Sequence, residues 1–386
     1  MNKPLRFGTF CPPITRPDRS PTLAISRQLD LTVAFDRLGY DEFFIGEHHN
    51  GGWELISSPE IFIATAAERT KHLRFGTGVT PLPYHHPLVV VNRMLQLDHI
   101  TRGRVIMGTG PGSLPSDAHY MGLDYSQARR RAGEALEAIM LLLEQDEPVT
   151  MQTDWFRLND AQIHYKPYTY PRFEVSATAT VSPTGPRLAG KHGISLLSIA
   201  ASSPAGFEAL QQTWSIVEEE AKEYGKTVTR DGWRLVGFFH LAETEAQARE
   251  DVRWGWRDLI GYLAATTNIV DQLSDIDDFD RTIDELNASG LMVIGTPDQL
   301  IERVEALQKQ TGGFGSYLGF SHEMADHEQT LKSHELMMRD VAPIFKRSVQ
   351  RQQESYDRMR GGDYVNAVSQ AQAAAAAQYE AVRAAR

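Results

Sequence analysis

Residues 31–49 read LTVAFDRLGYDEFFIGEHH, and they contain one complete transition from a helix to a strand. Apolar residues recur at helical spacing from Leu31 to Leu38, and Gly39 is typical of a helix C-terminus. The apolar run at residues 42–46 then predicts a short strand, which Glu47-His48-His49 follows directly. A helix that leads into a buried strand with polar residues behind it is the repeating unit of parallel α/β folds.

The same unit recurs along the chain. Eight strands are expected at residues 5–10, 42–46, 73–78, 104–108, 173–177, 193–199, 235–241 and 314–320, with helices between them. This alternation predicts a TIM-type (β/α)8 barrel in a single domain, residues 1–349. Near residues 146–166 we expect a small hairpin or loop insertion, and near 255–292 either a lid over the active-site end or a surface insertion. Residues 350–386 are rich in Gln, Arg and Ala, and they predict a helix-prone C-terminal tail that is either an exposed terminal helix or an oligomer contact.

The charge, the cysteine count and the apolar stretches of the sequence argue against several classes of protein. The formal net charge is −11, and no run of Lys and Arg is interleaved with aromatic residues, so nucleic acid is not an expected partner. Cys11 is the only cysteine, which excludes an intrachain disulfide and a multi-cysteine metal site. Residues 1–10 lack a charged segment followed by a long apolar run, and no apolar stretch reaches about 18 residues, so neither export nor membrane insertion is expected. The simplest expectation is therefore an enzyme that is located in the cytoplasm.

Functional groups of parallel barrels lie just beyond the C-terminal ends of the strands. At the second strand this rule selects His48 and His49, of which only one can face the barrel lumen if the extended backbone persists. An imidazole near neutrality can donate or accept a proton, although adjacent histidines are more often structural. No metal site is expected, because neither a His-Glu-x-x-His motif nor a cysteine cluster accompanies them.

The fifth predicted strand leads into Ser182-Pro183-Thr184-Gly185-Pro186 and a helical sequence. Hydroxyl groups and free backbone N–H groups at such a helix start form a candidate phosphate cradle. Ordinary helix capping explains this segment equally well. The Gly108–Gly112 segment fits the dinucleotide-binding pattern G-x-G-x-x-G poorly, because a proline and a further glycine follow.

Several short motifs occur together in a fixed order. They are Phe7-Gly8-Thr9-Phe10, Gly46-Glu47-His48-His49, Gly76-Thr77-Gly78-Val79, His85-His86-Pro87, Thr101-Arg102-Gly103-Arg104, Ser182-Pro183, Ala189-Gly190-Lys191-His192-Gly193 and Gly295-Thr296-Pro297. This ordered set resembles the bacterial luciferase-like flavin-dependent monooxygenases from Leu5 to Phe345. The segments 312–315, 320–325 and 333–336 are similar to the limonene monooxygenase-like branch of that family.

The resemblance implies a (β/α)8 barrel that uses reduced FMN and O2, through a flavin peroxide, to insert one oxygen atom into an apolar small molecule. A separate flavin reductase would supply the reduced FMN, and a homodimer is expected. A cyclic terpene or ketone is the preferred substrate class, on the resemblance to the branch alone. Two alternatives keep the barrel: a deazaflavin-dependent oxidoreductase that transfers hydride, and a nonenzymatic flavin-binding protein.

The resemblance also assigns roles to individual residues. His48 matches the family histidine that approaches the flavin and supports its oxygen adduct. Thr77, Gly78 and Val79 match the segment beneath the flavin ring, where the family often has a cis peptide between the second and third of these residues.

Ser182, Thr184 and Gly185 match the phosphate-binding segment of the family, and Arg129 lies where an arginine of the fourth helix is often found. The luciferases proper carry a Cys-Arg pair after the fourth strand, whereas this chain has Gly110-Pro111. The phosphate would therefore depend more on backbone N–H groups, and light emission is not expected.

The walls of the substrate pocket are expected to be aromatic. Candidate wall residues are Phe10, Trp254, Trp256 and Tyr262.

Overall fold

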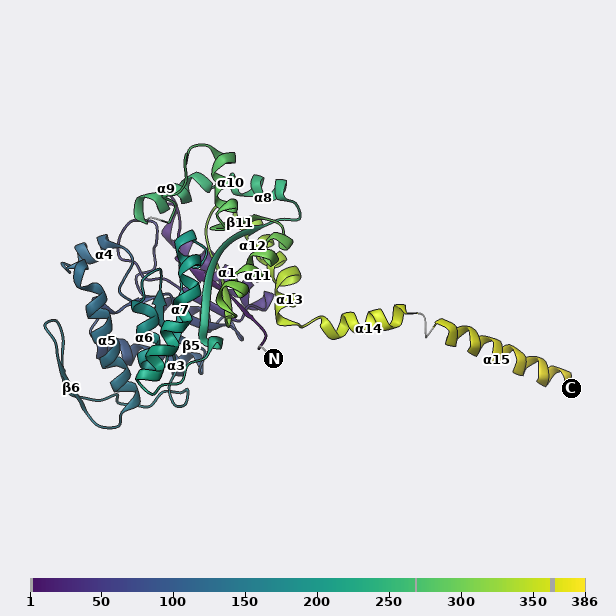
Figure 1. Ribbon diagram of the computed structural model, residues 1–386, viewed down its shortest axis with the longest axis horizontal. Coiled ribbons are helices and arrows are strands. Elements are labelled where there is room, and N and C mark those ends of the chain that lie inside the picture. Colours follow the sequence, from purple (N-terminus) through teal and green to yellow (C-terminus); the bar gives the residue numbers. More distant parts are fainter. Residues whose placement is uncertain (1–2, 268, 362–364, 386) are drawn as a thin grey trace. The chain divides into compact units, whose positions relative to one another are not determined.

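Eight parallel strands close into a barrel in the computed structural model, which describes residues 3–267, 269–361 and 365–385 (Figure 1). In barrel order they are β1 (Arg6–Cys11), β2 (Glu42–Ile45), β3 (Arg74–Thr77), β5 (Val105–Gly110), β8 (Glu174–Ala179), β9 (Ser195–Ser198), β10 (Trp233–Leu241) and β12 (Ser316–Phe320). The last strand pairs with the first, with Phe7 opposite Tyr317. All eight predicted strands and the predicted barrel are confirmed.

Helices surround this barrel (Figure 1). They are α1 (Pro21–Leu38), α2 (Pro59–Ala67), α3 (Pro87–Thr101), α5 (Ala128–Glu144), α6 (Thr184–His192), α7 (Pro204–Glu223), α11 (Pro297–Thr311) and α12 (His327–Leu336). As its sequence predicts, α1 ends at Gly39, whose φ of 86° is left-handed and favours glycine.

Further strands accompany the eight of the barrel, among them β4 (Thr80–Pro81), which pairs with the end of β5. The expected hairpin is present as β6 (Val149–Gln152) and β7 (Arg157–Ala161), which pair antiparallel. The short strand β11 (Met292–Gly295) was not predicted, and it pairs with the second half of β10. Because β10 is nine residues long, its first half can close the barrel while its second half extends beyond it.

A buried ion cluster fills the barrel at the N-terminal ends of the strands. Arg234 is fully buried, and its guanidinium donates to both oxygens of Glu42 at 2.7 and 2.8 Å and to Glu174 at 2.7 Å. Arg6 and Arg74, the first residues of their strands, bind the same two carboxylates at 3.1 and 2.7 Å. Burial disfavours the charged carboxylates, but the arginines outweigh it and hold the pKa values of Glu42 and Glu174 below their usual range.

These depressed pKa values predict a loss of stability in acid. A carboxyl group with a lowered folded-state pKa stabilises the protein fully above its unfolded-state pKa, and this contribution is lost as the pH falls toward the folded value. The free energy of unfolding should therefore decline as the pH drops below the ordinary glutamate pKa of 4.5. Denaturant titrations of the wild type and Glu174→Gln across this range measure the effect. The variant should be less stable at pH 7 and show a shallower decline; equal slopes would contradict the assignment.

Three helices gather at the other end of the barrel (Figure 1). They are α8 (Glu245–Val252), α9 (Trp256–Thr266) and α10 (Phe279–Ala288), of which α9 and α10 belong to the insertion predicted near 255–292. Leu259 and Leu263 of α9 share one buried apolar cluster with the barrel residues Phe10, Phe44 and Phe320. This shared cluster shows that α9 packs against the barrel mouth.

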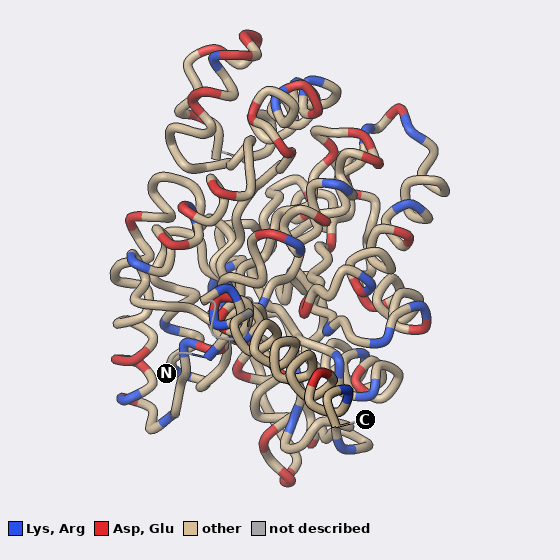
Figure 2. Tube along the Cα trace, turned by 90° about the vertical axis from the view of Figure 1, so that its right-hand side faces the viewer, with Lys and Arg blue, Asp and Glu red and all other residues tan. Residues whose placement is uncertain are grey.

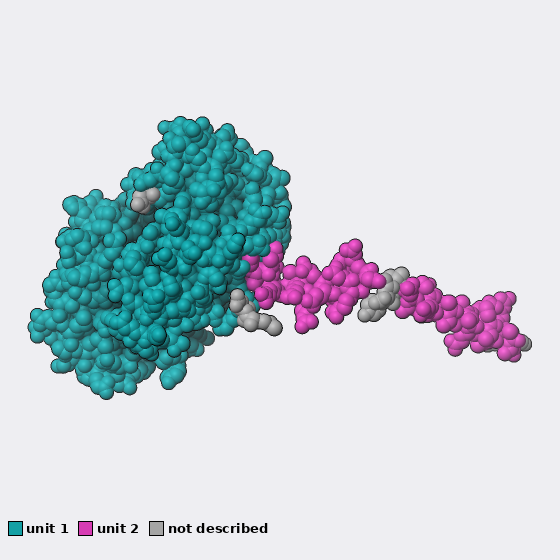
Figure 3. All heavy atoms as spheres, viewed as in Figure 1, with its two compact units in different colours: residues 1–341 teal, residues 342–386 magenta. Residues whose placement is uncertain are grey.

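The described residues fall into two compact units (Figure 3). The first, Met1–Val341, holds the barrel, and acidic and basic residues are interspersed along its helices (Figure 2). The second, Ala342–Arg386, consists of α13 (Ala342–Lys346), α14 (Gln350–Arg360) and α15 (Val365–Ala384), and most of its described side chains are exposed. Among the described residues, no helix is both long and apolar enough to cross a membrane.

Candidate active site

His48 lies three residues beyond the end of β2, at the barrel mouth. Its Nδ1 is 2.9 Å from Oδ2 of Asp117, which lies in the short helix α4 (Pro115–Tyr120) after β5. The other carboxylate oxygen of Asp117 accepts hydrogen bonds from the His49 backbone N–H at 3.0 Å and the Asn50 side chain at 2.9 Å. Asp117 thus fixes the backbone and the imidazole of this loop together.

Glu54 approaches the second nitrogen of His48. Its Oε2 lies 3.0 Å from His48 Nε2, within ion-pair distance, yet this buried oxygen has no hydrogen-bond partner among the residues that the structure describes. The other oxygen accepts a 2.5 Å hydrogen bond from the hydroxyl of Tyr262 on α9. The Tyr262 ring also stacks on Trp53 at 5.0 Å between centroids, so these two contacts anchor α9 beside His48.

The surroundings shift the pKa values of His48, Asp117 and Glu54 in different directions. Burial disfavours the charged imidazole, but the hydrogen bond to Asp117 and the charge of Glu54 outweigh it and raise the pKa of His48. For Asp117, burial is likewise outweighed by its bonds to His48 and to the His49 N–H, and its pKa is lowered. Burial raises the pKa of Glu54. Asp117 therefore favours its ionised form, whereas Glu54, with its oxygen 3.0 Å from Nε2 of His48, favours its protonated form more than an exposed glutamate does.

We expect the hydroxyl of Tyr262 to hold α9 in place through its hydrogen bond to Glu54. Tyr262→Phe removes its bond to Glu54 but keeps the ring that stacks on Trp53. A hydrogen bond to a charged group contributes about 1.5–3 kcal/mol, so hydrogen exchange of the α9 amides should accelerate roughly 10- to 100-fold. Tyr170→Phe, which changes a ring that is 95% exposed, is the control. Unchanged exchange in Tyr262→Phe would show that α9 is held by other contacts.

The segment after β3 approaches the lumen. The peptide bond between Gly78 and Val79 is cis, as the resemblance implied. The hydroxyl of Thr77 donates to the carbonyl of Gly108 at 2.8 Å, which ties β3 to β5. A Cβ on Gly78 would lie 2.9 Å from the ring of Phe10, so only glycine allows this close approach. Phe10 is buried, and its ring is 6.0 Å from that of Phe320.

The predicted phosphate segment begins α6. Ser182 Oγ accepts a hydrogen bond from the Thr184 backbone N–H at 3.2 Å and lies 2.9 Å from the Thr184 hydroxyl. A Cβ on Gly185 would lie 1.9 Å from the carbonyl oxygen of Thr178, so close packing of α6 on β8 is sufficient to require this glycine. The helix thus presents two hydroxyl groups and its N-terminal N–H groups at the carboxyl end of β8.

Arg129, Trp254 and Trp256 lie outside the barrel strands. Arg129 is exposed on α5, which contacts α6. Trp254 is 42% exposed, whereas Trp256 is buried and its ring lies 5.3 Å from that of Phe279 on α10. Of the predicted wall residues, Phe10, Trp256 and Tyr262 belong to the apolar cluster of the barrel mouth.

A cleft lies beside α1, close to His48. Residues 182–185 of the phosphate segment are not among those that line it. Its lining includes Pro12, Ile14, Gln28, Ile56, His322 and Glu323. Ile56 connects the cleft to the site, because its carbonyl accepts the backbone N–H of His48 at 3.0 Å.

Sequence reasoning missed Asp117 and Glu54. Both follow barrel strands at their carboxyl ends, which is the signal that selected His48. Only the residues directly after each strand were considered, whereas these carboxylates lie several residues further along their loops.

Comparison with known proteins identifies the family of this chain. The model of a family described as luciferase-like monooxygenase matches residues 5–313. Limonene 1,2-monooxygenase from Rhodococcus erythropolis is 47% identical over 339 residues, which cover 88% of this chain and 86% of that enzyme. 4-Hydroxyprotoasukamycin monooxygenase from Streptomyces nodosus subsp. asukaensis is 40% identical over 357 residues, or 91% and 95% of the two chains.

A solved structure is also similar. It is the oxygenating constituent of 3,6-diketocamphane monooxygenase from Pseudomonas putida, a type II Baeyer-Villiger monooxygenase in complex with FMN. The two chains superpose with a TM-score of 0.74 at 25% identity, covering 88% of this chain and 98% of the other.

The eight-stranded parallel barrel holds a histidine between two carboxylates at the carboxyl ends of its strands, where TIM-barrel enzymes have their active sites. The chain belongs to the luciferase-like monooxygenase family, within its limonene monooxygenase-like branch. The family and the branch predicted from the ordered motifs are thereby confirmed.

Proposed function

We propose that this protein uses reduced FMN and O2, by way of a flavin peroxide, to insert one oxygen atom into an apolar small molecule, a cyclic terpene or ketone. The single observation that carries the proposal is the pair formed by His48 Nε2 and Glu54 Oε2. These atoms lie 3.0 Å apart, and no hydrogen-bond partner of the buried oxygen is found within the described part of the chain. Unused hydrogen-bonding capacity of this kind suits a site that handles a proton during oxygen chemistry.

The cofactor fits the residues that are present. The hydroxyls of Ser182 and Thr184 and the first turn of α6 would hold its phosphate, with Arg129 nearby on α5. The segment Thr77–Val79 would lie beneath its ring system. When bound, reduced FMN would supply the activation of O2, which amino-acid side chains cannot provide.

The protein's own side chains would hold a proton at His48 and exclude water from the reacting groups. Asp117 holds Nδ1 of His48, so Nε2 is the nitrogen left to hold or move a proton. Phe10, Phe320 and Trp256 would form an apolar enclosure that excludes water from the reacting groups. Delivery of reduced FMN by a separate reductase, a homodimeric assembly and a cytoplasmic setting complete the proposal.

The direct test is incubation with reduced FMN and O2 across a panel of terpenes, cyclic ketones and long-chain aldehydes, with mass detection of products. We expect products that have gained one oxygen atom and that require reduced FMN. Turnover with reduced deazaflavin alone would establish hydride transfer instead. Absence of turnover with either cofactor would favour a nonenzymatic flavin-binding barrel.

The phosphate assignment makes a separate prediction. Ser182→Ala combined with Thr184→Val removes both hydroxyls but keeps Gly185, which the packing of α6 requires. Hydrogen bonds to charged groups contribute about 1.5–3 kcal/mol, so the dissociation constant for reduced FMN should rise roughly 10- to 100-fold in anaerobic titrations. Ser116→Ala, at an exposed serine of α4, is the control. Unaltered affinity in the double variant would place the phosphate elsewhere.

A further inference from the structure

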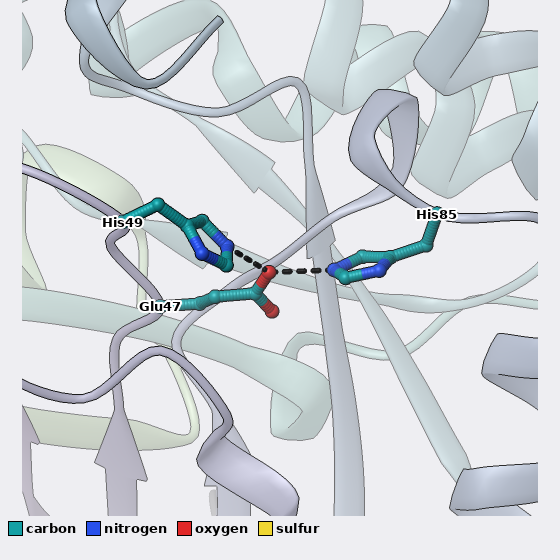
Figure 4. A group of neighbouring side chains, drawn as sticks. All are labelled: Glu47, His49 and His85. Carbon is teal, nitrogen blue, oxygen red and sulfur yellow. Dashed lines mark hydrogen bonds and ion pairs between the residues drawn. The ribbon is translucent and has the colours of Figure 1, made fainter. Parts of the chain in front are cut away.

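A second cluster of titratable side chains lies beside His48. Glu47 and His49 flank that histidine, whereas His85 follows the short helix η1 (Leu82–Tyr84) and precedes α3 (Figure 4). Successive residues of an extended segment point to opposite sides, so Glu47 and His49 can share a side that His48 does not occupy. The contacts agree: His48 binds Asp117 and approaches Glu54, while His49 binds Glu47.

The three side chains converge on one point. Nε2 of His49 and Nε2 of His85 lie 3.0 and 2.5 Å from the same oxygen of Glu47. One ligand atom from each residue lies within 4.8 Å of the other two. Both imidazole rings are directed toward the carboxylate in Figure 4. The Glu47 side chain is 1% exposed, and those of His49 and His85 are 24% and 17% exposed, so the cluster is largely shielded but not sealed.

Two chemical states satisfy this geometry. In the first, both imidazoles carry a hydrogen on Nε2 and donate to one carboxylate oxygen. In the second, each imidazole carries its hydrogen on Nδ1 instead, and a cation is bound by the two Nε2 lone pairs and one carboxylate oxygen. Zinc-class ions prefer this donor set, with bonds of about 2.0–2.2 Å that separate neighbouring ligand atoms by roughly 3.3 Å in a tetrahedral site. The observed 3.0 Å spacing is near that separation, and the 2.5 Å spacing would open by less than about 1 Å.

The surroundings favour a cation. Across residues 3–267, 269–361 and 365–385, the ion-pair partners found for Glu47 are these two histidines, with no Lys or Arg among them. Asp117 accepts the backbone N–H of His49 at 3.0 Å and so fixes the backbone that carries this ligand. Cys11 is the only cysteine in the sequence, so the donor set is confined to nitrogen and oxygen.

We propose that Glu47, His49 and His85 form a binding site for one divalent transition-metal ion of the zinc class. The ion would tie the loop after β2 to the segment that precedes α3, and so brace the barrel mouth on the side opposite His48. Three protein ligands leave at least one position for water or a small anion. Because the imidazoles must be unprotonated to bind, acidification should release the ion.

The test is calorimetric titration of the chelator-treated full chain with Zn²⁺, repeated with Co²⁺ while following its visible absorption. We expect saturation at one ion per chain, a rise in the melting temperature on Zn²⁺ addition, and cobalt bands typical of low coordination number. His85→Ala and Glu47→Gln should each weaken binding by about 100-fold or more. The second variant keeps an oxygen acceptor for both imidazoles, so it preserves the hydrogen-bonded state while removing the charge.

His72→Ala is the matched control, because His72 is exposed and precedes β3 at the opposite end of the barrel. It should bind Zn²⁺ like the wild type. The proposal would be overturned by failure of the wild-type chain to saturate at one ion. The proposal would also be overturned if both folded variants, Glu47→Gln and His85→Ala, kept wild-type affinity. The cluster would then be only a set of hydrogen bonds that joins two loops.

Discussion

His48→Gln is expected to lower kcat/KM by about 100- to 10,000-fold, the range attributed to a positioned acid or base. Glutamine keeps a polar group of similar reach but cannot carry a proton at the position of Nε2. The largest change should be in coupling, measured as oxygenated product formed per O2 consumed, because loss of the proton-handling group allows oxygen to be reduced without transfer.

The control for this experiment is His119→Gln, which changes an exposed histidine of α4 only two residues from Asp117. It should retain wild-type coupling. If His48→Gln oxygenates its substrate with the same coupling and kcat/KM as the wild type, the role assigned to His48 is wrong even though the barrel and the family stand.

Arg234→Met is expected to lower the free energy of unfolding by about 3–5 kcal/mol, because it leaves a buried carboxylate without its main partner. Glu42 is fully buried, and two of its hydrogen bonds come from Arg234. Arg6 remains at 3.1 Å, so some compensation survives and the loss should not exceed that range.

Chemical denaturation at pH 7 measures this effect. Arg130→Met is the control, since Arg130 binds Asp154 and Glu134 on the surface, and exposed pairs contribute about 0–1 kcal/mol. Equal losses in Arg234→Met and Arg130→Met would show that the ion cluster at the base of the barrel is energetically unimportant.

The barrel could be predicted from the sequence because each strand and the helix after it form a local pattern. Residues 31–49 contain the helix, the glycine that ends it and the strand, and the structure reproduces all three. The strand β11 was missed because the four-residue run Met292–Gly295 has no periodicity that separates it from a buried turn. Its pairing with β10 is a tertiary contact that local patterns do not reveal.

The site was predictable in part for the same reason. His48 follows a strand directly, and the rule about carboxyl ends of barrel strands selects it. The contact between Tyr262 and Glu54 joins residues 208 positions apart, and no spacing in the sequence indicates it. Nor did local motifs predict the cluster of Glu47, His49 and His85, because its ligands come from two loops that the barrel brings together.

Oxygen-isotope labelling tests the central claim most directly. The substrate identified by the panel is converted under ¹⁸O2 with reduced FMN, and the product is analysed by mass spectrometry. The account predicts one oxygen atom from O2 in each product molecule and no label from H2¹⁸O into that position under conditions without exchange. A product that carries no oxygen from O2 would contradict the assignment of this protein as a flavin-dependent monooxygenase.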